Sequence, residues 1–127
     1  RHGHLCAAAS TGGVLHKLPG RVGDTPLCGA GFYAHPQLGA CGTTGVGEAI
    51  LTHVLAFEAL RRAGERPGHA PTIAAELCAH ASRGHAGAAV GLILLRPDGE
   101  VAIVHASEHM SWGLAIGDAP PTSGLRR

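Results

Sequence analysis

Glycine and proline place the strongest limits on what the first half of this sequence can form. Between Thr11 and Asp24 the chain carries four glycines and one proline: Gly12, Gly13, Pro19, Gly20 and Gly23. Glycine disfavours helix and strand interiors because it loses the most backbone freedom on folding, and proline lacks a backbone N–H donor. We therefore expect a shaped loop over 11–24 rather than a long helix or strand.

Short apolar runs lie on both sides of this loop. Leu5–Ser10 follows a turn at 1–4 and is predicted to be a strand, whose partner strand we expect upstream of Arg1. Cys28–Ala34 and Gly39–Thr43 are predicted to form two more strands, joined by a turn near His35-Pro36.

Helical periodicity appears next. An apolar face runs from about Gly47 to Ala63 and consists of Ile50, Leu51, Val54, Leu55, Phe57 and Leu60. Near its end Glu58 stands three and four residues before Arg61 and Arg62, a spacing that favours ion pairs within one helix. Gly64 occupies the position of a left-handed C-terminal cap. We predict one continuous helix that is largely buried until its last turn.

Three further elements follow. A second helix is predicted from about Thr72 to Arg83, because a proline precedes it and a glycine follows it. Two apolar runs, Ala88–Arg96 and Glu100–Val104, enclose the turn sequence Pro97-Asp98-Gly99 and predict a β-hairpin. Met110–Ile116 is predicted to add a last strand.

The order of these elements predicts an α+β fold, with an antiparallel sheet that carries both helices on one face. The length suits one domain over 1–127, with an irregular tail over 117–127. Alanine supplies 22 residues, whereas Phe, Tyr and Trp together supply four, so the chain would form a thin core alone. We therefore expect another polypeptide to supply the layer on the second face of the sheet.

Charge, hydropathy and cysteine content exclude several functional classes. Lys and Arg total 10 against 9 Asp and Glu, so the chain lacks the positive field that would attract nucleic acid or an anionic membrane. No run approaches the ~20 apolar residues that a membrane span needs. The four cysteines form no C-x-x-C pair, so we expect reduced, mostly buried thiols. We also expect a cytoplasmic protein.

Two charged residues of the first loop are candidates for ligand binding. Arg21 and Asp24 are three residues apart, on a loop constrained by Pro19, Gly20 and Gly23. A guanidinium matches a carboxylate and an aspartate matches an ammonium, so the two side chains could hold the charged groups of an amino acid. The alternative is a local surface ion pair worth ~0–1 kcal/mol.

A second candidate lies in the segment Thr43–Glu48, just before the predicted helix. The Thr44 hydroxyl and the Gly45 amide could stabilise a developing oxyanion near a helix N-terminus. Helix capping by Thr44 is the alternative, since it needs the same residue type in the same place. The glycine order G-x-x-G-x-G does not match a nucleotide-phosphate loop.

The ten histidines raise the question of a metal site. His105-x-x-Glu108-His109 matches a zinc-peptidase spelling, but that motif requires a helix, whereas His105 ends a predicted hairpin strand. The other histidines are scattered without ligand spacing. We expect neither a metal nor a cofactor.

Four segments together resemble the Thr-type asparaginase family of N-terminal-nucleophile hydrolases. The family patterns are S-T-G-G, P-G-R-V-G-D-S/T-P, G-A-G-x-Y-A and T-G-x-G-E, and here they are Ser10–Gly13, Pro19–Pro26, Gly29–Ala34 and Thr44–Glu48. Glycosylasparaginases show H-G-R-V-G-D and T-G-N-G-D, so Pro19 and Glu48 favour the asparaginase/isoaspartyl peptidase branch. Asp24 disfavours the taspase-like branch, which lacks an acidic residue there.

The resemblance implies an αββα sandwich made from a precursor that cuts itself, so that a new N-terminal threonine becomes the nucleophile. Its hydroxyl attacks the side-chain amide of L-asparagine, or the β-linked bond of an isoaspartyl dipeptide, and its own α-amine serves as base. Thr11 corresponds to the residue that orients this nucleophile. Thr44 and Gly45 correspond to the oxyanion hole.

The substrate-binding residues implied by the resemblance are Arg21 for the α-carboxylate and Asp24 for the α-amine, with backbone contacts from Gly45 and Gly47. The nucleophile is expected one strand, roughly eight residues, upstream of Arg1. The chain is thus expected to be a β-subunit portion that needs the α subunit of the same precursor, in a dimer of α-β units. The alternatives are a glycosylasparaginase-like amidase, a non-catalytic amino-acid-binding module and an inactive fragment.

Overall fold

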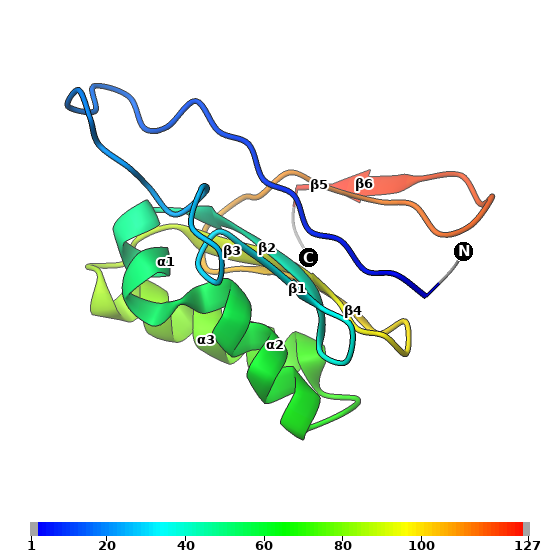
Figure 1. Ribbon diagram of the computed structural model, residues 1–127. Helices are drawn as coiled ribbons and strands as arrows, with labels where there is room; N and C mark the ends of the chain where they lie inside the picture. The colour runs from blue at the N-terminus through cyan, green and yellow to red at the C-terminus, as the bar shows by residue number, and fades with distance from the viewer. Residues whose placement is uncertain (1–2, 126–127) are drawn as a thin grey trace.

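The computed structural model of the chain describes residues 3–125. Its principal sheet is antiparallel, with the strand order β1 (Phe32–His35), β2 (Gly39–Gly45), β3 (Val90–Leu95) and β4 (Val101–His105). One face of this sheet carries α1 (Gly47–His53), α2 (Leu55–Glu65) and α3 (Ala70–Gly84), as Figure 1 shows. The predicted α+β class is therefore confirmed.

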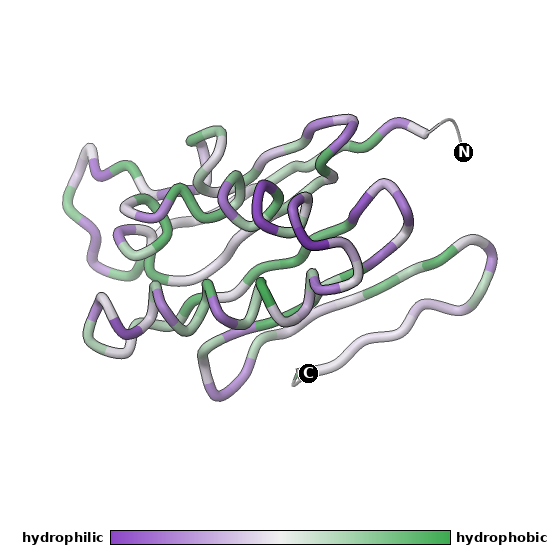
Figure 2. Tube along the Cα trace, turned by 90° about the horizontal axis from the view of Figure 1, so that it is seen from below, coloured by the Kyte–Doolittle hydropathy of each residue, from purple (hydrophilic) through white to green (hydrophobic). Residues whose placement is uncertain are grey.

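The alternation of side chains along β3 explains how the helices are held. Val90, Leu92 and Leu94 are buried in the core that the helices share. Ile93 and Leu95 point to the opposite face, because successive strand residues alternate between the two faces, and they stay 52% and 41% exposed. Each helix also carries both hydrophilic and hydrophobic residues along its length, and here the alternation follows the helical period (Figure 2).

The prediction of one continuous helix over 47–63 is wrong, because the chain breaks at Val54. That residue adopts a left-handed conformation with φ 46° and separates α1 from α2. The first amides of α2 are then satisfied from outside the helix: Phe57 N–H donates to the Gly29 carbonyl at 2.8 Å, and Ala56 N–H donates to the Ala30 carbonyl at 3.2 Å. Tertiary hydrogen bonds thus override the local helical pattern.

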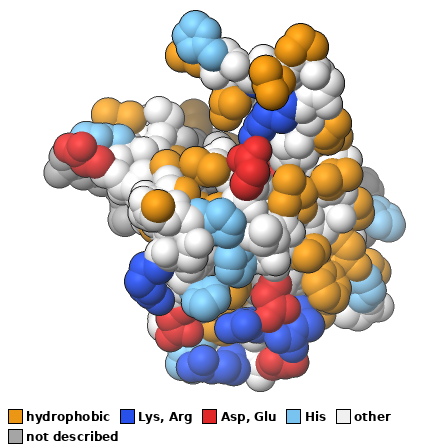
Figure 3. Space-filling view, turned by 90° about the vertical axis from the view of Figure 1, so that its left-hand side faces the viewer, with side chains coloured by type: hydrophobic (Ala, Val, Ile, Leu, Met, Phe, Trp, Pro, Cys, Tyr) orange, Lys and Arg blue, Asp and Glu red, His pale blue; other side chains and the backbone are white. Residues whose placement is uncertain are grey.

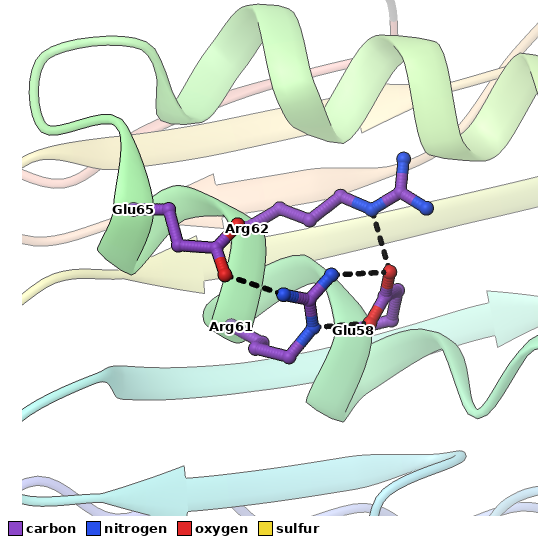
Figure 4. Close-up of polar contacts among 4 residues, drawn as sticks. All are labelled: Glu58, Arg61, Arg62 and Glu65. Atoms are coloured by element: carbon purple, nitrogen blue, oxygen red, sulfur yellow. Dashed lines mark hydrogen bonds and ion pairs between the residues drawn. The ribbon is translucent and has the colours of Figure 1, made fainter.

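The end of α2 differs from its prediction in one respect. Gly64 lies inside the helix, which ends at Glu65, so it is not a left-handed cap. The predicted ion pairs do form: Glu58 accepts from Arg61 at 2.8 Å and from Arg62 at 2.5 Å (Figure 4). The Arg61 guanidinium, helped by Arg62, lowers the pKa of the Glu58 carboxyl to about 2. This cluster forms the polar outer surface of α2.

The second helix and the hairpin form close to their predicted positions. The helix α3 extends the predicted range 72–83 by two residues at its start and one at its end. The strands β3 and β4 pair in register, with Ile93 opposite Ile103. The Gly99 amide closes their turn by donating to the Arg96 carbonyl at 3.0 Å.

The other face of the sheet is covered only in part. Residues 5–10, predicted as a strand, run extended along this face without forming one in the described chain, so that prediction is wrong (Figure 1). A strand needs a partner with which to exchange backbone hydrogen bonds. The turn predicted at 1–4 begins at residues 1–2, which lie outside the described residues.

A small second sheet lies on the same side (Figure 1). It pairs β5 (Trp112–Leu114) with β6 (Thr122–Gly124), so the tail over 117–127, predicted to be irregular, contains a strand; residues 126–127 lie outside the described part. The predicted strand at Met110–Ile116 forms over three of its residues. A cavity of about 540 Å³ separates this layer from the principal sheet and has Ile93 and Leu95 on its wall.

All four cysteines are free. Cys41 and Cys78 are buried, whereas Cys6 and Cys28 are exposed, so the expectation of mostly buried thiols holds for two of the four. Burial raises the pKa of the Cys78 thiol to about 12. Within residues 3–125, the helices are too short or too polar for any of them to cross a bilayer.

Candidate functional site

Three chain segments supply the predicted site residues. Thr11 ends the extended N-terminal segment, and Arg21 and Asp24 belong to the loop before β1. Two turns shape this loop: the Arg21 amide donates to the Leu18 carbonyl at 3.1 Å, and the Leu27 amide donates to the Asp24 carbonyl at 2.9 Å. Thr44 and Gly45 end β2, and Gly47 begins α1.

Two adjoining cavities bring these segments together. One of about 420 Å³ contains Arg21 and Gly47 in its wall, and the other, of about 370 Å³, extends over the open face of the principal sheet. Both cavities share five lining residues: Thr11, Asp24, Thr25, Thr44 and Gly45. All six residues predicted for the site therefore lie around one continuous space.

Arg21 does not form the local ion pair that was the alternative to ligand binding. Among the described residues it pairs with Glu48, which accepts from its Nη2 at 2.9 Å and from its Nε at 3.1 Å. The hydrogen bond from the Glu48 backbone amide, together with that from Arg21, lowers the pKa of this carboxyl below its ordinary value. Glu48 thus fixes the orientation of the guanidinium from α1.

Asp24 is a buried carboxylate at the boundary between the two cavities. It is 7% exposed, and its Oδ2 accepts a hydrogen bond from the Thr43 hydroxyl at 3.4 Å. The carbonyl oxygens of Ala30 and Gly31 lie 3.0 and 3.2 Å from the same hydroxyl, so these two acceptors share its single proton with Asp24. Thr43 therefore links the loop that carries Asp24 to β2. Its position next to Thr44 in the sequence did not predict this role.

Gly47 is required because the two charged side chains pass close to its backbone. A Cβ at this position would lie 3.0 Å from Asp24 Oδ1 and 3.1 Å from Arg21 Nη2. Ordinary contact begins at 3.4 Å, so any side chain here would displace both groups. The absence of a side chain at Gly47 thus lets Arg21 and Asp24 approach the start of α1 together.

Gly45 is required for a different reason. Its φ of 135° lies in a region that glycine favours, and a Cβ there would collide with the Ala89 carbonyl oxygen. That carbonyl accepts instead from the Val46 amide at 2.8 Å. The end of β2 is therefore held against the segment that leads into β3.

The capping role considered for Thr44 is contradicted. The N-cap of α1 is Val46, which makes no side-chain cap hydrogen bond, and Thr44 lies two residues earlier on β2 with its side chain exposed to the cavities. The helix α1 has only seven residues, so its dipole adds less than the long helix predicted from sequence. Any oxyanion stabilisation must come from the hydroxyl and the backbone amide themselves.

Local hydrogen bonds hold the backbone that follows Thr11, which lines both cavities. The Gly13 amide donates to the Thr11 hydroxyl oxygen at 2.9 Å, and Lys17 Nζ donates to the Gly12 carbonyl at 2.7 Å. The loop that follows projects beyond α1 with Leu15 and Leu18 exposed (Figure 1). Figure 3 shows hydrophobic and histidine side chains on this projection, with basic and acidic side chains below it.

Among the lining residues that were not predicted from sequence, three come from positions that could affect binding. Lys17 adds a second cation to the cavity that holds Arg21, and Met110 and Ser111 close the other cavity. Because Lys17 is close to Arg21 in sequence, its place near this site could have been predicted. Met110 and Ser111 lie far from the other site residues in sequence and precede the short strand β5, so no local pattern could have placed them there.

The zinc-peptidase motif at 105–109 lacks the helix that it requires. Residues 105–109 form no helix, since His105 ends β4 and a bend follows. In residues 3–125, no group of three or more His, Cys, Asp or Glu side chains is placed to hold a metal ion.

Several known proteins are similar in sequence to this chain. The family described as Asparaginase matches residues 1–124. The isoaspartyl peptidase/L-asparaginase of Bos taurus is 42% identical over 117 residues, which are 89% of this chain and 36% of the relative. The isoaspartyl peptidase of Salmonella typhimurium is 40% identical over 129 residues, with coverage of 100% and 40%. A plant-type L-asparaginase of Pyrobaculum calidifontis is 58% identical over 59 residues, with coverage of 46% and 20%.

The relatives are much longer than this chain. The chain spans 36% and 40% of the length of the first two relatives. The described residues therefore represent one part of the architecture that such proteins have.

Proposed function

Because this chain belongs to the asparaginase family, we propose that it is the β-subunit portion of an enzyme that hydrolyses the side-chain amide of L-asparagine and the β-linked bond of isoaspartyl dipeptides. One observation carries the proposal. Thr11, Asp24, Thr44 and Gly45 line both cavities, with Arg21 and Gly47 in one of them. Two threonines, an arginine and an aspartate thus line one space formed by adjoining cavities of about 370 and 420 Å³.

The proposed reaction uses an N-terminal threonine that the precursor supplies from outside residues 1–127. Its hydroxyl attacks the substrate carbonyl carbon while its α-amine accepts the hydroxyl proton. The Thr44 hydroxyl and the Gly45 amide donate to the resulting oxyanion. The protonated amine returns its proton to the leaving nitrogen, which departs as ammonia or as an amino acid. Water then hydrolyses the acyl ester and releases aspartate.

The charged residues select and orient the substrate. Arg21, fixed by Glu48 at 2.9 Å, is suited to a bidentate contact with the substrate α-carboxylate. Asp24 presents Oδ1 toward the same position near Gly47, where it can accept from the substrate α-amine. Thr11 lines both cavities, where its hydroxyl can orient the nucleophile. Such fixed donors and acceptors supply the orientation that hydrolysis requires.

The complete fold and assembly follow from the same proposal. We place an α subunit of the same precursor against the open face of the principal sheet, where Ile93 and Leu95 are exposed. It would complete an αββα sandwich around residues 1–127, which would act as one domain, and two such α-β units would form a dimer. An apolar sheet face of this kind is favourably covered by a second layer.

The test is to express the full precursor that contains these residues and to identify its cleavage products by mass spectrometry. We expect a new N-terminal threonine, and we expect release of ammonia from L-asparagine and of aspartate from β-aspartyl-leucine. A terminus without a nucleophilic side chain would contradict the mechanism. Binding of L-aspartate without turnover would favour the second candidate, an amino-acid-binding module that uses Arg21 and Asp24.

The substrate-binding role of Arg21 has a separate test. Arg21→Ala should lower kcat/KM for L-asparagine by an amount corresponding to about 2–5 kcal/mol, because a buried carboxylate would lose its partner. Arg62→Ala is the matched control, since Arg62 is an exposed arginine on the outer surface of α2, paired with Glu58. If the two variants behaved alike, Arg21 would not contact the substrate.

A further inference from the structure

The bend between β4 and β5 brings a side chain to the candidate site from a distant part of the sequence. Met110 and Ser111 line the cavity of about 370 Å³ that also contains Thr44 and Gly45. This cavity lies on the side away from Arg21 and Lys17, which line only the neighbouring cavity. The two cavities therefore differ in the side chains that line them: Arg21 and Lys17 line only one, whereas Ile93 and Met110 line only the other.

The sheet register explains how Met110 reaches this position. Thr44 pairs with Gly91, and Gly91 pairs with His105, so these three residues form one row across β2, β3 and β4. Directly paired residues of an antiparallel sheet project to the same face. Gly91 has no side chain, and a Cβ there would collide with the Met110 sulfur. Met110 thus occupies the space that Gly91 leaves between Thr44 and His105.

Hydrogen bonds hold the bend that carries Met110. His105 Nδ1 and the Ser107 carbonyl lie 2.9 Å apart, a contact in which the ring N–H donates, and the Ser107 hydroxyl donates to the His109 carbonyl at 3.0 Å. The Met110 amide donates to the Leu125 carbonyl at 2.9 Å. These bonds fix the backbone on both sides of Met110. Its side chain lies over Gly91 and forms part of the cavity wall.

We propose that Met110 is a specificity-determining residue of this site, whose side chain limits the size of the group that leaves the substrate carbonyl. This inference rests on the proposed function. If Arg21 and Asp24 hold the α-carbon groups in one cavity, and Thr44 and Gly45 hold the carbonyl oxygen in the shared wall, the leaving group extends into the other cavity toward Met110. Asparagine releases ammonia, which needs little space, whereas an isoaspartyl dipeptide releases an entire amino acid.

The experiment compares kcat/KM for β-aspartyl-leucine with kcat/KM for L-asparagine in the complete processed enzyme. Met110→Ala should raise this ratio about tenfold or more, since pocket contacts of this size discriminate substrates by roughly 10–200-fold. Met110→Leu, of similar volume, should keep the wild-type ratio. Ile116→Ala is the matched control, because Ile116 is exposed and lines only the larger interlayer cavity.

A second variant tests whether the effect passes through the methionine. Gly91→Ala must displace the Met110 sulfur, because the new Cβ would collide with it, while the His105 Cβ at 3.1 Å needs only a small shift. It should change the substrate ratio in the wild-type background and leave it within twofold in the Met110→Ala background. An equal change in both backgrounds would overturn the proposal.

The outcomes separate this inference from the proposed function. A wild-type enzyme that hydrolyses both substrates, with a ratio that Met110→Ala leaves within twofold, overturns the role of Met110 alone. If the enzyme binds both compounds without turnover, calorimetry can measure the ratio of their two dissociation constants instead. The role of Met110 is then tested by whether Met110→Ala changes that ratio by more than twofold. An enzyme that neither binds nor hydrolyses either compound overturns both proposals.

Discussion

Replacing Gly47 by alanine tests the geometry of the candidate site without removing a charge. The new Cβ would lie 3.0 Å from Asp24 Oδ1 and 3.1 Å from Arg21 Nη2, inside the 3.4 Å at which ordinary contact begins. Each charged group must therefore move by about 0.3 to 0.4 Å, or the start of α1 must move instead. Both groups that we assign to substrate binding are displaced by a single methyl group.

The expected effect is large on catalysis and small on stability. A misplacement of ~1 Å can reduce catalysis by about 10²-fold, so a shift of a few tenths of an ångström should lower kcat/KM for L-asparagine by about tenfold. Alanine also has a higher helix propensity than glycine by up to ~1 kcal/mol, which offsets part of the steric strain in the folded state. We therefore expect the loss of activity to come with little change in Tm.

The assay is steady-state kinetics on the complete processed enzyme, with thermal unfolding measured on the same preparations. Gly84→Ala is the matched control, because its nearest neighbour would be the His53 ring at 3.8 Å, an ordinary contact at the end of α3. The reasoning would be refuted if Gly47→Ala kept kcat/KM within twofold of Gly84→Ala.

Two further predictions concern the fold. Leu60 is fully buried, so Leu60→Ala should lower the free energy of unfolding by about 2–5 kcal/mol in urea titrations, whereas Leu15→Ala, at a position 91% exposed, should change it by less than ~0.5 kcal/mol. In the folded state Arg61 and Arg62 lower the pKa of Glu58 from an ordinary 4.5 to about 2. The contribution of the charged carboxylate to the free energy of unfolding is therefore complete above pH 4.5 and is lost as the pH falls through 2. Glu58→Gln should therefore flatten the pH dependence of the unfolding free energy between these values, by about 1 kcal/mol or less, and an unchanged slope would contradict the role of this ion pair.

Sequence patterns predicted the hairpin, α3 and the ion pairs of α2 because each depends on residues close together in the chain. The turn Pro97-Asp98-Gly99 carries its own geometry, and Glu58 reaches Arg61 and Arg62 within one turn of helix. The break at Val54 could not be predicted in this way. It depends on the carbonyls of Gly29 and Ala30, which reach the first amides of α2 from a different loop.

The candidate site shows the same division between local and distant information. The motifs supplied Thr11, Arg21, Asp24, Thr44, Gly45 and Gly47, and the structure places all six around one space. They did not show that Arg21 pairs with Glu48, although both residues lie within the recognised motifs. Met110 was also missed, since its place beside Thr44 follows only from the register of three strands and from the absent side chain of Gly91.

The most direct test of the proposed mechanism is the kinetic effect of Thr44→Val in the complete enzyme. Valine keeps the shape of threonine and replaces its hydroxyl with a methyl group, and the exposed position at the end of β2 leaves the core unchanged. Loss of one oxyanion donor should lower kcat for L-asparagine by roughly 10²–10³-fold with little change in KM. A kcat within twofold of the wild-type value would contradict the assignment of Thr44 to the oxyanion hole, and with it the central claim.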